Sequence, residues 1–201
     1  MLAAPRRRLG RLLSLRPSGQ GMDAMTLRPD NLGPNNLGPN NLRPATPADF
    51  PFIRALAQDP ANAPFITDED EAALADYLSD PTARLYIWEE NALPAGFALF
   101  CEIGHPTGRV ELRRLALAKT GGGRGVEFVK ALTDHAFSSL GAARVWMDAS
   151  AENPRACHLY AKLGYRLEGT QRAHWWRPAL GRAVDLCLFG MRRAEWAGGR
   201  P

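Results

Sequence analysis

The sequence has no apolar run that approaches the roughly 20 residues a helix needs to cross a bilayer, so we expect no membrane segment. It has few cysteines: three in 201 residues, at Cys101, Cys157 and Cys187. They form no C-x-x-C pair and have no histidine at ligand spacing, which argues against a disulfide framework and a structural metal. We therefore expect a reducing, cytoplasmic compartment, no metal, and cysteines that serve as small core residues.

Acidic residues are missing from residues 1–22, which contain five of the 25 basic residues. Residues 23–41 add one arginine and two aspartates, so 19 basic and 19 acidic residues remain in 42–201. The high pI of about 9.2 therefore belongs to the N-terminal stretch. A domain without net charge is a poor candidate for binding a phosphate backbone, and we expect no nucleic-acid partner.

Residues 1–41 have the composition of a disordered tail rather than of a folded domain. The Arg-rich segment 1–20 resembles a transit peptide. The alternative, which we favour, is an upstream start codon with Met22 or Met25 as the true first residue. The Asn-Leu-Gly-Pro-Asn repeat that follows has Pro and Gly in its units, which disfavours helix and strand. We predict one domain over 42–196 and a short C-terminal tail over 197–201.

The stretch 110–165 reads as strand, glycine loop, helix, strand and helix. Glycines crowd into Gly121–Gly125, where backbone amides can converge on an anion because positive φ costs glycine little. The helix expected over Val126–Leu140 would point its N-terminus at whatever the loop holds. A flexible connector is the plainer interpretation of the glycines. The loop lacks the Lys-Ser/Thr ending of a P-loop and the following acidic residue of a dinucleotide fold.

Two blocks of this stretch resemble the GNAT superfamily of N-acetyltransferases. The pattern Q/R-x-x-G-x-G/A, which binds the acetyl-CoA pyrophosphate, falls on Thr120–Gly125, with Thr120 where Gln or Arg is usual. The block Asn153–Tyr165 matches N-x-x-A-x-x-x-Y-x-K-L-G-F/Y almost throughout. The ending Gly181–Trp196 is similar to the branch that acetylates ribosomal-protein N-termini. The resemblance implies an α/β (α+β) GNAT fold, a mixed and mostly antiparallel sheet flanked by helices on both faces.

The rest of the domain fits that order of elements. Helices are expected from Thr46 onward and over Asp68–Ser79, and a hairpin of strands is expected over Arg84–Glu89 and Ala95–Ile103. The last two strands are predicted at 166–172 and 183–191. The segment His174–Gly181 is predicted to be a linker between them.

The resemblance also implies the residues of the site. Acetyl-CoA is the expected co-substrate, with Tyr160 as the acid for the departing thiolate, and a core tyrosine as the alternative. The expected coenzyme-binding residues are Leu115, Leu117, Thr120, Gly121, Gly122, Gly123, Arg124, Gly125 and Asn153. N-capping of a helix is an equal explanation for Asn153. Lys119, Arg124 and Arg155 are either phosphate ligands or solvated surface charges.

Glu111 is the expected general base, at the strand position where the histone-acetylating branch carries its glutamate. Its apolar neighbours favour desolvation, which suits proton abstraction. A salt bridge with Arg113 or Arg114 is the alternative, and Glu102 is the second candidate for the base.

The acceptor is expected to be a primary amine, either a peptide N-terminus or a small amine. Trp175 and Trp176 either pack in the core or wall the acceptor pocket, where they would attract a cation. The acidic run 68–71 either caps a helix or meets a cationic substrate. The alternative function is an acetyl-CoA sensor or partner-binding module without turnover. A homodimer is left open.

Overall fold

The computed structural model describes residues 41–198, so the predictions made for residues 1–40 and 199–201 lie outside the described residues. The strands are β1 Leu42–Pro44, β2 Arg84–Glu90, β3 Leu93–Cys101, β4 Arg109–Leu117, β5 Arg144–Ser150, β6 Arg166–Arg177 and β7 Arg182–Arg192. The helices are α1 Phe50–Gln58, α2 Glu71–Ser79, α3 Arg124–Ser138, α4 Pro154–Lys162 and α5 Arg193–Gly198, with 3-10 turns η1 Pro47–Asp49 and η2 Pro178–Leu180.

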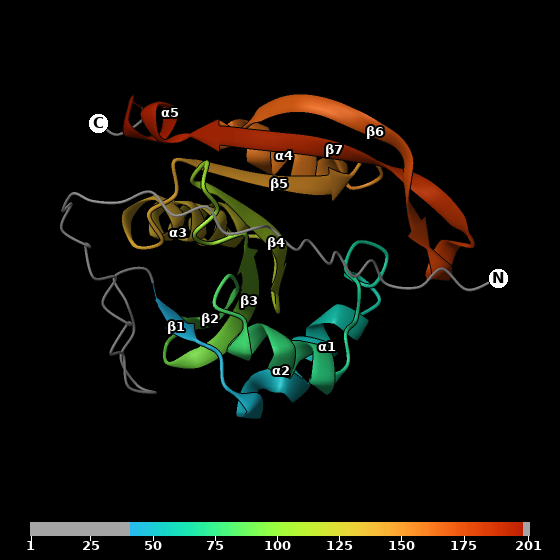
Figure 1. The fold of residues 1–201 in the computed structure, drawn as a ribbon. Helices are drawn as coiled ribbons and strands as arrows, with labels where there is room; N and C mark the ends of the chain where they lie inside the picture. Colours follow the sequence, from blue (N-terminus) through green and yellow to red (C-terminus); the bar gives the residue numbers. More distant parts are fainter. Residues whose placement is uncertain (1–40, 199–201) are drawn as a thin grey trace, which may run out of the picture. The chain divides into compact units, whose positions relative to one another are not determined.

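The strands form one seven-stranded sheet in the order β1-β2-β3-β4-β5-β7-β6. Every neighbouring pair is antiparallel except β4 and β5, which run parallel. Helices cover both faces (Figure 1). The predicted fold class, a mixed and mostly antiparallel sheet between helices, is therefore confirmed.

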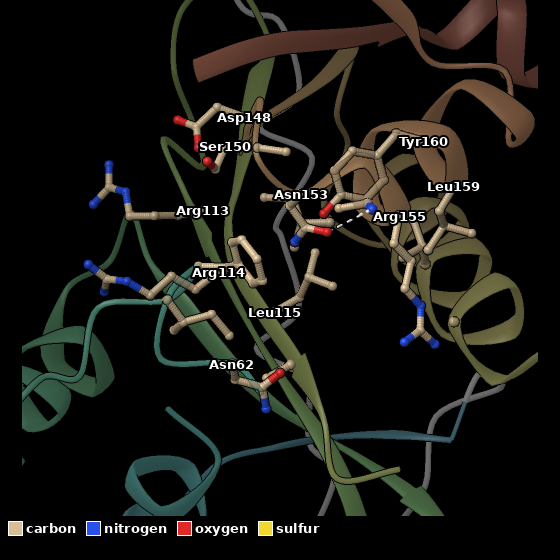
Figure 2. Close-up of a pocket in the computed structure, with 18 of the residues that line it drawn as sticks. Asn62, Arg113, Arg114, Leu115, Asp148, Ser150, Asn153, Arg155, Leu159 and Tyr160 are labelled. Atoms are coloured by element: carbon tan, nitrogen blue, oxygen red, sulfur yellow. Dashed lines mark hydrogen bonds between the residues drawn. The ribbon is translucent and has the colours of Figure 1, made fainter. Parts of the chain in front are cut away.

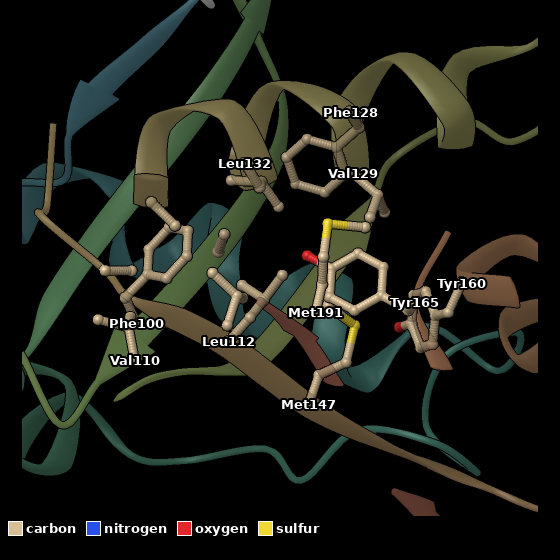
Figure 3. Close-up of a cluster of buried hydrophobic side chains, with 14 of the residues drawn as sticks. Phe100, Val110, Leu112, Phe128, Val129, Leu132, Met147, Tyr160, Tyr165 and Met191 are labelled. Carbon is tan, nitrogen blue, oxygen red and sulfur yellow. The ribbon is translucent and has the colours of Figure 1, made fainter. Parts of the chain in front are cut away.

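Each face of the sheet has its own apolar core. On one face, α1 and α2 bury side chains such as Phe50, Ile53 and Leu74 against β2 and β3. On the other face, Phe128, Val129 and Leu132 of α3 have no exposed surface, and they pack over the sheet as Figure 3 shows. Each such side chain stabilises the fold by about 1.5–3 kcal/mol. The helical spacing of apolar residues after the glycine loop predicted this face of α3.

The centre of the sheet opens between β4 and β5. Their parallel pairing covers only three residues of each strand, 109–111 and 144–146, and ends at the pair Glu111 and Trp146. Two residues further on, Arg113 forms a β-bulge, since β3 pairs Leu112 and Arg114 with consecutive residues. A bulge bends its strand and increases the local twist. The two strands therefore diverge, as Figure 1 shows, and leave the β5-facing edge of the second half of β4 without a partner strand.

Two predicted boundaries were wrong. The second helix begins at Glu71 rather than at Asp68, because Asp70 is its N-cap and accepts a hydrogen bond from the Ala73 amide at 2.9 Å. The segment that starts at His174 is not a linker, since β6 continues to Arg177 and pairs Trp175 with Val184 of β7. Aromatic residues such as Trp175 are favoured in strands. The pairing of Trp175 with Val184 extends the β6–β7 hairpin beyond the centre of the sheet.

Candidate active site

A cavity of about 630 Å³ occupies the opening between β4 and β5. Its walls come from the second half of β4, the end of β5, the N-terminal ends of α3 and α4, the loop 61–67 and the part of β6 around Trp175. A cavity of this size falls in the range of small-molecule and cofactor sites. The divergence of two central strands thus creates the site.

The glycine loop closes one end of the cavity. Gly121, Gly122 and Gly123 have φ values of 97°, 58° and 84°, a region that glycine adopts without strain. Gly123 is the N-cap of α3, whose 15 residues direct their positive dipole end at the loop. Thr120 and Gly125 line the cavity itself. The loop therefore offers amides and a helix N-terminus for an anion, as the motif predicts.

Gly125 has a packing role as well. A Cβ at this position would lie 3.3 Å from Cδ2 of Leu159, closer than most real Cβ contacts. The absence of a side chain thus lets α3 and α4 approach each other at the end of the cavity where both helices begin.

The N-terminus of α4 is the second anion-binding element at this end. Asn153 caps the helix, with Oδ1 accepting a hydrogen bond from the Ala156 amide at 3.1 Å (Figure 2). Capping is therefore what the Asn153 side chain does in the structure, and the residue also lines the cavity. Arg155, in the first turn of α4, is exposed and borders the same space.

The unpaired edge of β4 forms one long wall. Leu115 and Leu117 are half-buried and line the cavity, and β3 pairs with the opposite edge of their strand. The β5-facing backbone groups of this segment are thus available to an extended ligand, in the manner of an added strand.

Two of the basic residues predicted near the phosphates have other positions. Arg124 does not line the cavity, and its Nε lies 3.2 Å from Oε2 of Glu90 at the end of β2. Lys119 is exposed and also lies outside the cavity lining. Arg155 is the residue of this group that the structure brings to the cavity.

Glu111 lines the cavity but has an ion-pair partner. Its side chain is nearly buried, and Oε2 lies 2.6 Å from Nη2 of Arg113 on the same strand. The salt bridge that the sequence left as an alternative is therefore formed, and Glu111 still lines the cavity. Its assignment as base stays a prediction.

Glu102, the second candidate for the base, lies outside the cavity lining. It accepts hydrogen bonds from Arg109 at 2.7 and 2.8 Å and from the Trp146 indole at 2.9 Å. The Arg109 guanidinium, helped by Trp146, holds the pKa of Glu102 below its usual range despite partial burial. A carboxylate held this way is a weak base, and we assign it a structural role.

Tyr160 reaches the cavity from α4, beside Asn153 (Figure 2). It is buried, with its ring 5.5 Å from that of Phe189 and 6.3 Å from that of Tyr165. Burial raises the pKa of Tyr160 well above its ordinary value, and the neighbouring Tyr165 adds to the shift. The phenol is therefore protonated at neutral pH and able to donate, so packing and the predicted acid role are compatible at this residue.

Asp148 is the site residue that the sequence analysis missed. It lies on β5, two residues beyond the last pair with β4, and lines the cavity. Asp148 is exposed at the opening, and partial desolvation by the surrounding walls nonetheless raises its pKa. The negative charge of Glu111 raises that pKa further. No sequence signal marked this aspartate, because the charges that act on it come from two other strands, β4 and β6.

The two tryptophans have different environments. Trp175 lines the cavity and is half-buried, while Trp176 is 61% exposed. They are consecutive in β6, so their side chains point to opposite faces. The guanidinium of Arg177 lies over the Trp175 ring, 3.9 Å from its centre. Trp175 therefore walls the pocket, whereas Trp176 neither packs in the core nor lines the cavity.

The cysteines have no place in this chemistry. Cys101 is buried in the core, and burial raises the pKa of its thiol to about 12. Burial likewise raises the pKa of Cys157 to about 11, with help from the nearby Cys187. Thiols of this kind are poor nucleophiles at neutral pH.

Within residues 41–198, no three His, Cys, Asp or Glu side chains are grouped to hold a metal ion. No helix in that range is both long and apolar enough to cross a membrane.

Comparison with known proteins agrees with this geometry. A sequence model of the acetyltransferase (GNAT) family matches residues 50–165, so the chain belongs to that family. An uncharacterized N-acetyltransferase of Mycobacterium tuberculosis (strain ATCC 25618 / H37Rv) is 31% identical over 125 residues, which cover 58% of this chain and 78% of the relative.

Other matches are named as spermidine acetyltransferases. Spermidine N(1)-acetyltransferase of Escherichia coli (strain K12) is 26% identical over 115 residues, and this chain spans 62% of that relative's length and 56% of its own. Spermidine N-acetyltransferase from Vibrio cholerae in complex with CoA and spermine superposes with a TM-score of 0.70 at 19% identity, over 78% of this chain and 96% of the other. At that identity the likeness shows the fold. These matches give no support to the ribosomal-protein branch that the C-terminal residues resemble.

Proposed function

We propose that this protein transfers the acetyl group of acetyl-CoA to a primary amine of a small cationic acceptor of the polyamine type. The observation that carries the proposal is the single cavity that runs between the diverging strands, from the glycine loop at Thr120 to the aromatic wall at Trp175. A coenzyme and an acceptor can meet in such a space without a covalent enzyme intermediate. Family membership supports the reaction class.

The coenzyme end would take the pyrophosphate at the amides of Gly121–Gly125 and at the N-terminus of α3. Arg155 would add a positive charge there, since no ion-pair partner engages it among the described residues. The pantetheine arm would lie along Leu115–Leu117 and pair with the open edge of β4. Asn153 would hold the arm indirectly, by fixing where α4 begins.

The reaction needs a neutral amine, a polarised thioester carbonyl and a proton for the thiolate that leaves. Tyr160 is proposed as the donor of that proton, because its phenol is protonated and reaches the cavity. Glu111 is the base predicted from the sequence. An alkylamine with a pKa of about 10.4 is mostly protonated at neutral pH, so a base near the acceptor is required.

The acceptor class rests on the relatives and on the aromatic wall of the cavity. The E. coli relative is named a spermidine acetyltransferase, and the V. cholerae structure holds CoA and spermine. At the acceptor end of this cavity, Trp175 offers an aromatic face, which attracts a cation by about 0.5–2 kcal/mol. The comparisons do not favour a peptide N-terminus as acceptor.

The ion pair of Glu111 with Arg113 favours a second candidate, an acetyl-CoA-binding module without turnover. The guanidinium of Arg113 already occupies one oxygen of this carboxylate, at 2.6 and 2.9 Å. If no other group takes the proton, the protein would bind the coenzyme and not use it.

Two measurements on the full chain test the proposal. Calorimetric titration with acetyl-CoA should show binding, and its absence at millimolar ligand would refute coenzyme use. Thiol release should follow the addition of spermidine or spermine, and should exceed that with a peptide of free N-terminus. Tyr160→Phe should lower kcat about 10²–10⁴-fold and leave coenzyme binding in place. Coenzyme binding without thiol release from any amine would instead establish the module.

A further inference from the structure

Four of the six Asp, Glu and Arg side chains that line the cavity are engaged in ion pairs within the described residues. Glu111 pairs with Arg113, and Arg114 of β4 pairs with Glu69 of the segment before α2. At the α4 end, Glu152 lies 2.5 Å from Arg182 of β7. These pairs cancel most of the charge that lines the cavity.

Asp148 is the exception among the acidic residues of the cavity. No hydrogen bond or ion pair engages its carboxylate within the described part of the chain, and the residue keeps accessible surface toward the opening. Figure 2 shows it with Ser150 on β5, above Arg113 and Arg114 of β4. An exposed carboxylate without an ion-pair partner at the opening of the cavity is free to receive a cationic ligand.

The position of Asp148 relative to β4 follows from the strand register. Glu111 pairs in parallel with Trp146, and Asp148 is two residues further along β5, so it shares a face with Trp146. It therefore stands at the first point where the strands have separated. The acceptor wall at Trp175 borders the same cavity.

We propose that Asp148 is the catalytic carboxylate of the acceptor site, which receives the ammonium group of the amine substrate and takes its proton. The inference rests on the proposed acetyl transfer and assigns to Asp148 the step that the sequence assigned to Glu111. Glu111 then stays in its pair with Arg113 and shapes the field around Asp148.

The proton balance of this step is complete. The ammonium gives one proton to Asp148, which releases it to solvent, and the nitrogen lone pair then attacks the thioester carbonyl. The carbon–sulfur bond breaks with its electron pair on sulfur, and Tyr160 donates a proton to the thiolate. The second proton lost by the nitrogen restores the Tyr160 phenol. The products are the N-acetylated amine, the free thiol of CoA and one proton.

The surroundings of Asp148 suit this task. Burial and the charge of Glu111 hold its pKa above that of an ordinary aspartate, which makes it a stronger base. Opposing them are the positive charges of Arg113 and Arg114 on β4 and the imidazole of His174 on β6. The carboxylate must be ionised to act, so activity should fall as the pH drops through its pKa.

The test compares Asp148→Asn with Glu111→Gln, two changes that each replace a carboxylate by an amide of the same shape. Asp76→Asn, on the exposed side of α2 outside the cavity lining, controls for the loss of one negative charge. For Asp148→Asn we expect kcat/KM for spermidine to fall about 10²–10⁴-fold and the low-pH limb of its profile to disappear. Coenzyme affinity should stay unchanged. Glu111→Gln should retain that limb.

A binding measurement needs no turnover and separates this inference from the proposed function. Spermidine titrated into the complex of the protein with CoA should bind about 10- to 100-fold more weakly to Asp148→Asn than to the parent. Equal binding and an unchanged pH profile would overturn the inference, as would loss of the low-pH limb in Glu111→Gln instead. If the parent binds spermidine through Asp148 but shows no turnover, the ammonium site is retained. The proton-transfer step and the proposed function are then both rejected.

Discussion

Arg177 links the acceptor wall to the opposite side of the cavity. It is 4% exposed, and its Nη2 donates hydrogen bonds to the carbonyl oxygens of Ala63 and Ile66, the latter at 3.1 Å. These carbonyls belong to the loop after α1, which Figure 1 shows beside the end of the β6–β7 hairpin. The same guanidinium stacks on Trp175. We predict that Arg177→Ala loosens this wall and raises the KM for the acceptor.

The magnitude follows from opposing contributions. Two hydrogen bonds from a charged donor contribute about 1.5–3 kcal/mol each, and the contact with Trp175 contributes about 0.5–2 kcal/mol. Burying a guanidinium costs several kcal/mol. That cost is visible here, because burial lowers the pKa of Arg177 and its Nε has no hydrogen-bond partner among the described residues. We expect a net loss of about 1–3 kcal/mol in the free energy of unfolding.

The functional effect should be confined to the acceptor end. Trp175 loses the group that fixes its ring, so the KM for spermidine should rise about tenfold, while acetyl-CoA binds as before at α3 and α4. Arg177→Lys keeps the positive charge but loses the planar guanidinium. Its stability and its KM for spermidine should lie between those of the parent and of Arg177→Ala. Arg172→Ala removes an exposed arginine from the same hairpin, outside the cavity lining, and should change neither quantity.

The assays are urea unfolding and steady-state kinetics with varied spermidine. An unchanged KM in Arg177→Ala, with stability within about 0.5 kcal/mol of the parent, would refute the linking role. Equal loss of coenzyme and acceptor binding would also refute it, since that result would mean general unfolding.

Three further changes test other parts of the site. Gly123→Val should fold, because a Cβ at this position meets nothing within 4 Å. It should bind acetyl-CoA more weakly in calorimetry, since φ is 84° and the side chain crowds the proposed phosphate position. Unaltered affinity would show that the phosphate does not bind at this loop. Trp175→Ala should raise the acceptor KM and Trp176→Ala should not, so equal effects would contradict the assignment of opposite faces. Arg109 lowers the pKa of Glu102 in the folded protein, so the ionised carboxylate stabilises the fold above the pKa that Glu102 has in the unfolded chain. That stabilisation is lost as the pH falls through the pKa of Glu102 in the folded protein. The destabilisation of Glu102→Gln in urea unfolding should therefore shrink toward acidic pH, and a constant difference would contradict the argument.

The sequence alone determined the elements and the family. The apolar periodicity of α3, the glycines before it and the block from Asn153 to Tyr165 are local patterns, because helix periods, positive φ values and capping depend on neighbours within a few residues. The structure brings the glycine loop and the start of α4 to the same cavity, and their role in coenzyme binding stays a prediction. The prediction of the last strands failed at His174 because the pairing that extends β6 comes from β7.

Only the tertiary structure decided which charges are free to act. Glu111 could have been a base or half of an ion pair, and the structure shows its carboxylate paired with Arg113. Asp148 stays unpaired because the two central strands separate before reaching it. The contacts of Arg177 join residues 111 and 114 positions apart in the chain. Electrostatic environment depends on groups brought together by packing, and no local pattern in the sequence records those distances.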